Sequence, residues 1–225
     1  MTKQQISKLS IDQITQQLVE GLKQTSLLEY TGVFAGIGSV WFSRKENILV
    51  YPVGLINTII YIYISLEGHL IGEASVNLYY TIMSIYGWIL WAKKDEQQQH
   101  IVIITKSNTK QWLQQLAFFA AFYIGIYICL EYLKKVFAPG AIPWADAFAS
   151  ATAYTGMWLM AKKKVESWYW WIATNLASIP LYFVKGYVFT SFQYVVLLIL
   201  AVFGLISWIN KTKKDDAITM EYARD

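Results

Sequence analysis

Charged residues and cysteine are both scarce in this 225-residue chain. Charged side chains make up 15% of the sequence and apolar side chains 56%, whereas a soluble domain has about 25% charged residues. The single cysteine, Cys129, cannot form an internal disulfide and says nothing about redox compartment. The sequence also lacks a P-loop, paired metal-ligand motifs and a nucleophile motif. These absences argue against a soluble protein and against an enzyme, and no cofactor is expected.

Long uncharged stretches account for most of the chain. A helix that crosses a bilayer needs about 20 mostly apolar residues, because every backbone polar group must be paired within the segment. Five stretches meet this test, and two weaker ones, of which one contains Asp146, are counted with them. We therefore predict an all-α polytopic membrane protein with seven transmembrane helices in the lipid bilayer. The predicted spans are 30–43 (beginning near Leu27), 47–66, 74–92, 111–130, 143–161, 167–184 and 186–210.

The first 25 residues are polar and do not have the apolar core of a signal peptide. Ile11, Ile14, Leu18 and Leu22 recur at intervals of three and four, which predicts an amphipathic helix on the membrane surface. An ordinary solvated helix is the alternative.

Basic residues indicate the orientation of the chain. With the N-terminus outside and the C-terminus inside, the inner loops hold most of the lysines and arginines, as the positive-inside bias requires. We therefore predict an N-out, C-in orientation. The membrane is expected to be a bacterial inner membrane. The basic residues of the inner loops account for the net charge of +4. No clustered basic face suggests a nucleic-acid partner.

The chain also contains an internal repeat of three helices. Matching residues keep their order at an offset of 118 that later becomes 117, which favours duplication over chance. Because an even number of spans separates equivalent helices, the two units run parallel in a 3+1+3 arrangement, a layout common in transporters. The expected segments are an amphipathic helix at 1–25, a first repeat at 26–92, a loop and linker helix at 93–135, a second repeat at 136–210 and a cytoplasmic tail at 211–225. The matches include Lys45 with Lys163, Tyr51 with Tyr169, Asn57 with Asn175, Gly87 with Gly204, and Trp91 with Trp208.

Two of the predicted spans carry aromatic and polar residues at steps of three and four, so that each set lies on one helical face. The sixth span has Trp168, Trp171 and Asn175, and the third has Asn77, Tyr80 and Ser84. An unpaired amide in hydrocarbon costs roughly 4–8 kcal/mol, so these faces should point into the bundle. The alternative for Asn57 and Asn175 is hydrogen bonding between helices, and for Trp168 it is the interfacial aromatic belt.

The spans contain no Lys–Asp pair, histidine chain or row of acids of the kind that marks proton relays. The acidic residues lie at span ends, where we expect them to be hydrated. Facilitated diffusion is therefore favoured over ion-driven transport.

The stretch 166–175, which reads WxxWxxxN from Trp168 to Asn175, resembles the PnuC family of nicotinamide riboside transporters, and 77–91 is similar to that family's third span. The resemblance implies a homotrimer of seven-helix protomers, related to SWEET proteins, that acts as a vitamin B3 uniporter by alternating access. Phosphorylation in the cytoplasm would then trap the riboside. The resemblance also places Trp168, Trp171 and Asn175 in the substrate-binding region. From the helical faces and the repeat we add Asn57, Asn77, Tyr80, Ser84 and Gln193.

The chemistry of the ligand fits such residues, because nicotinamide riboside carries a pyridinium charge and an amide that suit an aromatic wall and an asparagine. Thiamine, another aromatic cation, would suit the same features, and riboflavin is also considered. A channel or a membrane scaffold remains the alternative from a different class.

Overall fold

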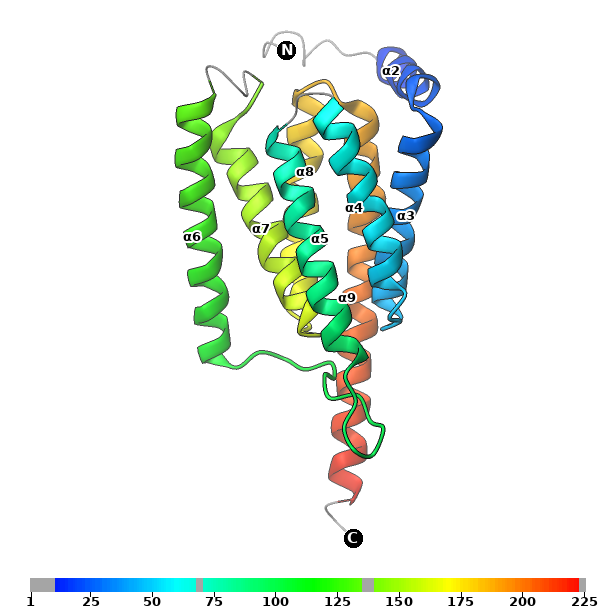
Figure 1. The fold of residues 1–225 in the computed structure, drawn as a ribbon, viewed down its shortest axis with the longest axis vertical. Coiled ribbons are helices and arrows are strands. Elements are labelled where there is room, and N and C mark those ends of the chain that lie inside the picture. The colour runs from blue at the N-terminus through cyan, green and yellow to red at the C-terminus, as the bar shows by residue number, and fades with distance from the viewer. Residues whose placement is uncertain (1–10, 68–70, 135–139, 223–225) are drawn as a thin grey trace.

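The computed structural model describes residues 11–67, 71–134 and 140–222, and this part of the chain is helical, with no β-strand (Figure 1). A helix occupies each of the seven segments that the sequence predicts as spans. The described helices are α2 (Ile11–Gln24), α3 (Leu27–Arg44), α4 (Val50–Glu67), α5 (Ile71–Ala92), α6 (Thr109–Leu133), α7 (Pro143–Ala161), α8 (Ser167–Val184) and α9 (Val188–Tyr222).

The helix ends follow from local chemistry. Ser26 begins α3, with its hydroxyl accepting a bond of 3.1 Å from the Glu29 N–H. Asn108 and Gln111 form a capping box at the start of α6. Pro143 occupies the first turn of α7, where its missing N–H is tolerated. At the other end of the chain, α9 continues beyond residue 210 and makes the segment 211–222 helical.

Three of the described helices are long and apolar enough to cross a membrane: α4, α6 and the part of α9 from Val188 to Lys214. The all-helical, membrane-type fold class predicted from composition is thus confirmed.

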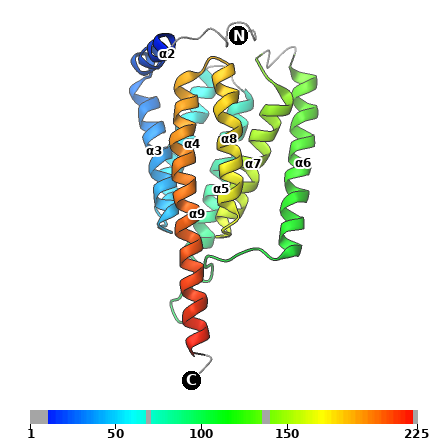
Figure 2. The ribbon, with the colours of Figure 1, turned by 180° about the vertical axis from the view of Figure 1, so that it is seen from behind.

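Six helices form a closed ring. Going round it, α3 packs on α4, α4 on α5, α5 on α7, α7 on α8, α8 on α9, and α9 returns to α3. Helix α6 lies outside the ring against α7, and α2 lies at the edge of the end opposite to the C-terminus, above α3, and also contacts α9 (Figures 1 and 2). The ring is thus made of α3–α5 from one half of the chain and α7–α9 from the other.

Two matching aromatic pairs fill the core at one end of the ring. This end, from which the C-terminal part of α9 projects (Figure 1), is called the C-terminal end of the ring. Tyr51 packs edge-on against Trp91, with ring centroids 5.1 Å apart, and Trp168 packs edge-on against Trp208 at 5.5 Å. A Cβ atom on Gly87 would lie 2.5 Å from the Tyr51 ring. Both halves therefore use a glycine and a tryptophan on their third helix to hold an aromatic ring from their second helix.

This packing corrects one correspondence of the repeat. The structural counterpart of Tyr51 is Trp168, because each is 1% exposed and packs on equivalent partners, whereas Tyr169 is 44% exposed. The offset is therefore already 117 at this position, and the matching identity at Tyr169 is coincidental.

The Tyr51 hydroxyl is buried with no hydrogen-bond partner among the described residues. An unsatisfied buried polar group costs about 1–3 kcal/mol, so we expect Tyr51→Phe to raise the melting temperature by about 2–4 °C or more. Tyr79→Phe is the matched control: it should lower the melting temperature, because the Tyr79 hydroxyl donates to the Tyr154 carbonyl oxygen at 3.0 Å. Thermal denaturation of the purified variants measures both, and a decrease for Tyr51→Phe would show that this hydroxyl has a partner.

Candidate functional site

Helices α5, α7 and α8 bring three aromatic side chains together, which we call the aromatic wall: Tyr80, Tyr154 and Trp171. The Tyr80 and Trp171 ring centroids lie 6.2 Å apart, and Tyr80 meets Tyr154 edge-on at 6.3 Å. Gly156 makes room for the indole, since a Cβ atom there would lie 3.2 Å from Trp171. The wall joins the two halves of the ring and brings together two residues of the predicted site, Tyr80 and Trp171, from different repeats.

Two buried polar side chains lie one helical turn from the wall. Asn175 follows Trp171 on α8 and is 4% exposed, and Ser84 follows Tyr80 on α5 and is 3% exposed. Neither side chain makes a hydrogen bond within the part of the chain that the structure describes. Since buried polar groups are normally paired, we regard these two side chains as candidates for binding a polar solute.

The remaining predicted polar residues have partners within the protein. Asn57 donates to the Gly32 carbonyl oxygen at 2.7 Å and packs against Gly36, which ties α4 to α3. Asn77 donates to the Glu73 carbonyl oxygen of its own helix at 2.9 Å. Gln193 on α9 lies beside the hydroxyl of Tyr61, on α4. The Asn57 contact is the hydrogen bond between helices that was the alternative for this residue, whereas the Asn77 bond stays within α5.

Trp168 lies apart from the aromatic wall. Its ring is 1% exposed, fits against Gly204 and Trp208, and its indole N–H has no partner among the described residues. This position is in the core at the ring's C-terminal end, which differs from the exposed aromatic belt considered as its alternative.

Tyr154 is the aromatic residue that sequence reasoning missed. It lies in a helix of small residues with no matching aromatic face. The one signal available was that it is the only tyrosine of the predicted span 143–161.

Glu166 contradicts the expectation that acids at span ends are hydrated. It is 4% exposed, and its carboxylate accepts bonds from the Ser107 N–H at 2.8 Å and the Ser107 hydroxyl at 2.7 Å. These bonds satisfy the carboxylate without water and fasten the segment before α6 to the start of α8.

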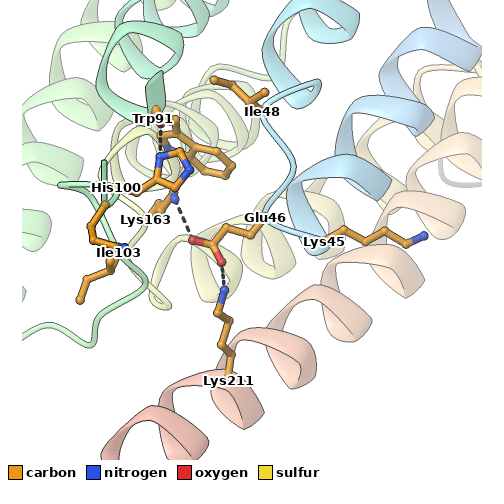
Figure 3. Close-up of a pocket in the computed structure, with 9 residues that line it drawn as sticks. Lys45, Glu46, Ile48, Trp91, His100, Ile103, Lys163 and Lys211 are labelled. Carbon is orange, nitrogen blue, oxygen red and sulfur yellow. Dashed lines mark hydrogen bonds and ion pairs between the residues drawn. The ribbon is translucent and has the colours of Figure 1, made fainter. Parts of the chain in front are cut away.

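A cavity of about 520 Å³ opens at the C-terminal end of the ring, and none of the eight predicted site residues lines it (Figure 3). Glu46 lies at this cavity between two lysines, Lys163 at 2.7 Å and Lys211. Burial raises the pKa of the Glu46 carboxyl, but the hydrogen bonds and charges of the two lysines outweigh burial and hold the pKa below its ordinary value. The other residues that line the cavity include Lys45, Ile48, Trp91 and His100.

The protein-family model described as "Nicotinamide mononucleotide transporter" matches residues 26–210. Riboflavin/roseoflavin transporter RibM of Streptomyces davaonensis is 24% identical over 195 residues, which cover 87% of this chain and 90% of that protein. Nicotinamide riboside transporter PnuC of Escherichia coli is 24% identical over 215 residues, and its Neisseria mucosa namesake is 28% identical over 200 residues. These alignments cover 84% of this chain in both cases, with 87% of the first protein and 74% of the second.

A solved structure described as the vitamin B3 transporter PnuC superposes with a TM-score of 0.68 at 25% identity, covering 95% of this chain and 94% of that one. Because the family model matches most of the chain, residues 26–210, this chain belongs to the nicotinamide mononucleotide transporter family.

Proposed function

We propose that this protein carries nicotinamide riboside across the membrane by facilitated diffusion. The observation that carries the proposal is Asn175, a residue that is 4% exposed, makes no hydrogen bond among the described residues and lies one turn from Trp171 and the aromatic wall. An amide of this kind can both donate to and accept from the carboxamide of the ligand. The aromatic faces would attract the pyridinium charge, and no carboxylate is needed to hold the cation.

The proposed architecture has seven spans, α3 to α9, in the 3+1+3 order. The six-helix ring supports it, because α3–α5 and α7–α9 contribute equally and α6 stands outside. Parallel repeats of this kind hold their substrate at the interface between the repeats, and rocking of one repeat against the other gives alternating access.

We also propose that the C-terminal end of the ring faces the cytoplasm of a bacterium and that the chain assembles as a homotrimer in the inner membrane. The basic residues at the ends of α3, α5, α7 and α9 support the orientation. Phosphorylation in the cytoplasm would keep the riboside from leaving.

Counterflow in proteoliposomes tests this function. Vesicles that contain the purified chain and unlabelled riboside should accumulate labelled riboside transiently, without an ion gradient. A protonophore should not change the rate, because the proposed site contains no proton relay. Absence of exchange would contradict the proposal, and a conductance in the same vesicles would favour the channel alternative.

The second candidate substrate is another aromatic vitamin. The similarity to a riboflavin transporter extends over 87% of this chain, so family membership alone does not fix the substrate. Excess thiamine or riboflavin should leave riboside counterflow unchanged if the proposed substrate is right. Inhibition by one of them as strong as that by unlabelled riboside would identify it as a substrate instead.

A further inference from the structure

Equivalent positions of the two repeats meet each other at the C-terminal end of the ring. The Ser43 hydroxyl lies 2.9 Å from the Met160 sulfur, and Lys163 Nζ donates to Glu46 at 2.7 Å. Each pair is separated by 117 positions, the offset that the match of Tyr51 with Trp168 gives, so the counterpart of Lys163 is Glu46 and not Lys45. Equivalent residues can contact each other only near the axis that relates the repeats, so both contacts lie close to this axis.

Two reciprocal hydrogen bonds surround this point. The indole N–H of Trp91 donates to the Ala161 carbonyl oxygen at 3.2 Å, and that of Trp208 donates to the Ser43 carbonyl oxygen at 3.1 Å. The third helix of each repeat therefore bonds the end of the first helix of the other. Bonds of this kind would have to break if the repeats moved apart at this end.

Glu46 and Lys163 share an unusual backbone conformation. Their φ angles are 55° and 51°, in the left-handed region that non-glycine residues seldom adopt. Such strain persists only where the surrounding structure holds it, and it often marks functional positions. Here it directs the two side chains toward each other, and the Lys163 ammonium is almost completely buried beneath the cavity (Figure 3).

Within residues 11–67, 71–134 and 140–222, fewer side-chain hydrogen bonds join the repeats towards the other end than in this cluster. Among the described residues, the side-chain bonds between repeats outside this cluster include Tyr79 to the Tyr154 carbonyl, at the level of the aromatic wall. Tyr61 and Gln193 interact nearer the end where α2 lies. The structure is therefore fastened on the C-terminal side of the aromatic wall.

We propose that the ion pair between Glu46 and Lys163 is a latch that closes the ring on its C-terminal side and must separate each time solute leaves toward that side. The latch rests on the proposed function in one respect: transport requires the ring to open on its C-terminal side. It does not depend on which solute is carried.

Chemical labelling of a buried cysteine tests the latch without any substrate. Cys129→Ala removes the single cysteine, and Ser84→Cys then places a thiol inside the ring. A charged, membrane-impermeant thiol reagent is applied from the C-terminal side of oriented vesicles. Glu46→Gln and Lys163→Gln should each speed labelling about tenfold or more, because removal of one member of a buried ion pair is strongly destabilising.

Lys211→Gln is the matched control. It removes another partner of Glu46, but the Lys211 side chain is 51% exposed and its pairing is weakened by solvent, so labelling should change less than about twofold. A charge-exchanged chain, Glu46→Lys with Lys163→Glu in the Lys211→Gln background, should restore slow labelling. The third change removes the lysine that would otherwise repel the new one.

Labelling of Glu46→Gln at the parental rate would overturn the latch, and so would a charge-exchanged chain that labels as fast as Glu46→Gln. Faster labelling from both sides together with a lower melting temperature would also overturn it, because that result indicates general loosening. Counterflow of riboside by the unaltered chain is independent of these outcomes, so the latch and the transport proposal can fail separately.

Discussion

Replacement of Trp171 or Asn175 by alanine should nearly abolish exchange of riboside at low concentration. A desolvated cation–π contact contributes about 2 kcal/mol, which corresponds to a roughly 30-fold loss of affinity for Trp171→Ala. Asn175→Ala leaves the ligand carboxamide unpaired in a buried site and should weaken binding roughly tenfold or more. Concentration-dependent counterflow, supported by ligand-induced thermal shift, measures both losses.

Two control variants separate binding from folding. Trp144→Ala removes a tryptophan that is 64% exposed in the first turn of α7, and should leave affinity unchanged. Asn57→Ala removes the bond to Gly32 and should lower the melting temperature with little effect on affinity. Unchanged counterflow in Trp171→Ala and Asn175→Ala would show that the solute does not pass along the aromatic wall.

Gly204→Ala should be the most destabilising single methyl addition in the ring. The new Cβ atom would lie 2.4 Å from the Trp168 ring, which cannot withdraw because Trp208 packs against it. Overpacking of this kind costs about 1–3 kcal/mol, and the corresponding fall in melting temperature is about 2–12 °C. Thermal denaturation in one detergent measures the effect, and Gly87→Ala should behave alike because its Cβ would meet Tyr51 at 2.5 Å.

Gly125 provides the matched control on α6. A Cβ atom there has nothing within 4 Å, so Gly125→Ala should leave stability equal or raise it by up to about 1 kcal/mol through helix propensity. Combining Gly204→Ala with Trp168→Phe should recover part of the loss, since the smaller ring retreats from the new methyl group. Equal melting temperatures for Gly204→Ala and Gly125→Ala would refute the packing argument.

The helices could be predicted from the sequence because apolar runs and the charges that end them are local features. The spans at 143–161 and 167–184 coincide with α7 and α8, even though Asp146 made the first of them a weak candidate. Asp146 is accommodated because its carboxylate accepts a bond from the Ile142 N–H at 2.6 Å and pairs with Lys185 at 2.5 Å. This pairing joins residues far apart in sequence, so periodicity could not indicate it.

The candidate site could be predicted only in part, for the same reason. The meeting of Tyr80 with Trp171 followed from two helical faces that had to turn inward. Which polar groups stay free depends on neighbours: Asn57 bonds to the Gly32 carbonyl oxygen, whereas Asn175 makes no hydrogen bond among the described residues. Glu46 and Lys163 gave no signal either, because their pairing needs left-handed backbone at two loop positions and closure of the ring.

The uninterrupted course of α9 has a mechanical consequence. At 35 residues it is about 50 Å long, and roughly 18 Å of that length lies beyond residue 210. Because the helix is continuous, a tilt of a few degrees in its ring portion would also displace its far end. The projecting end of α9 would in this way follow any rearrangement of the helices that form the ring.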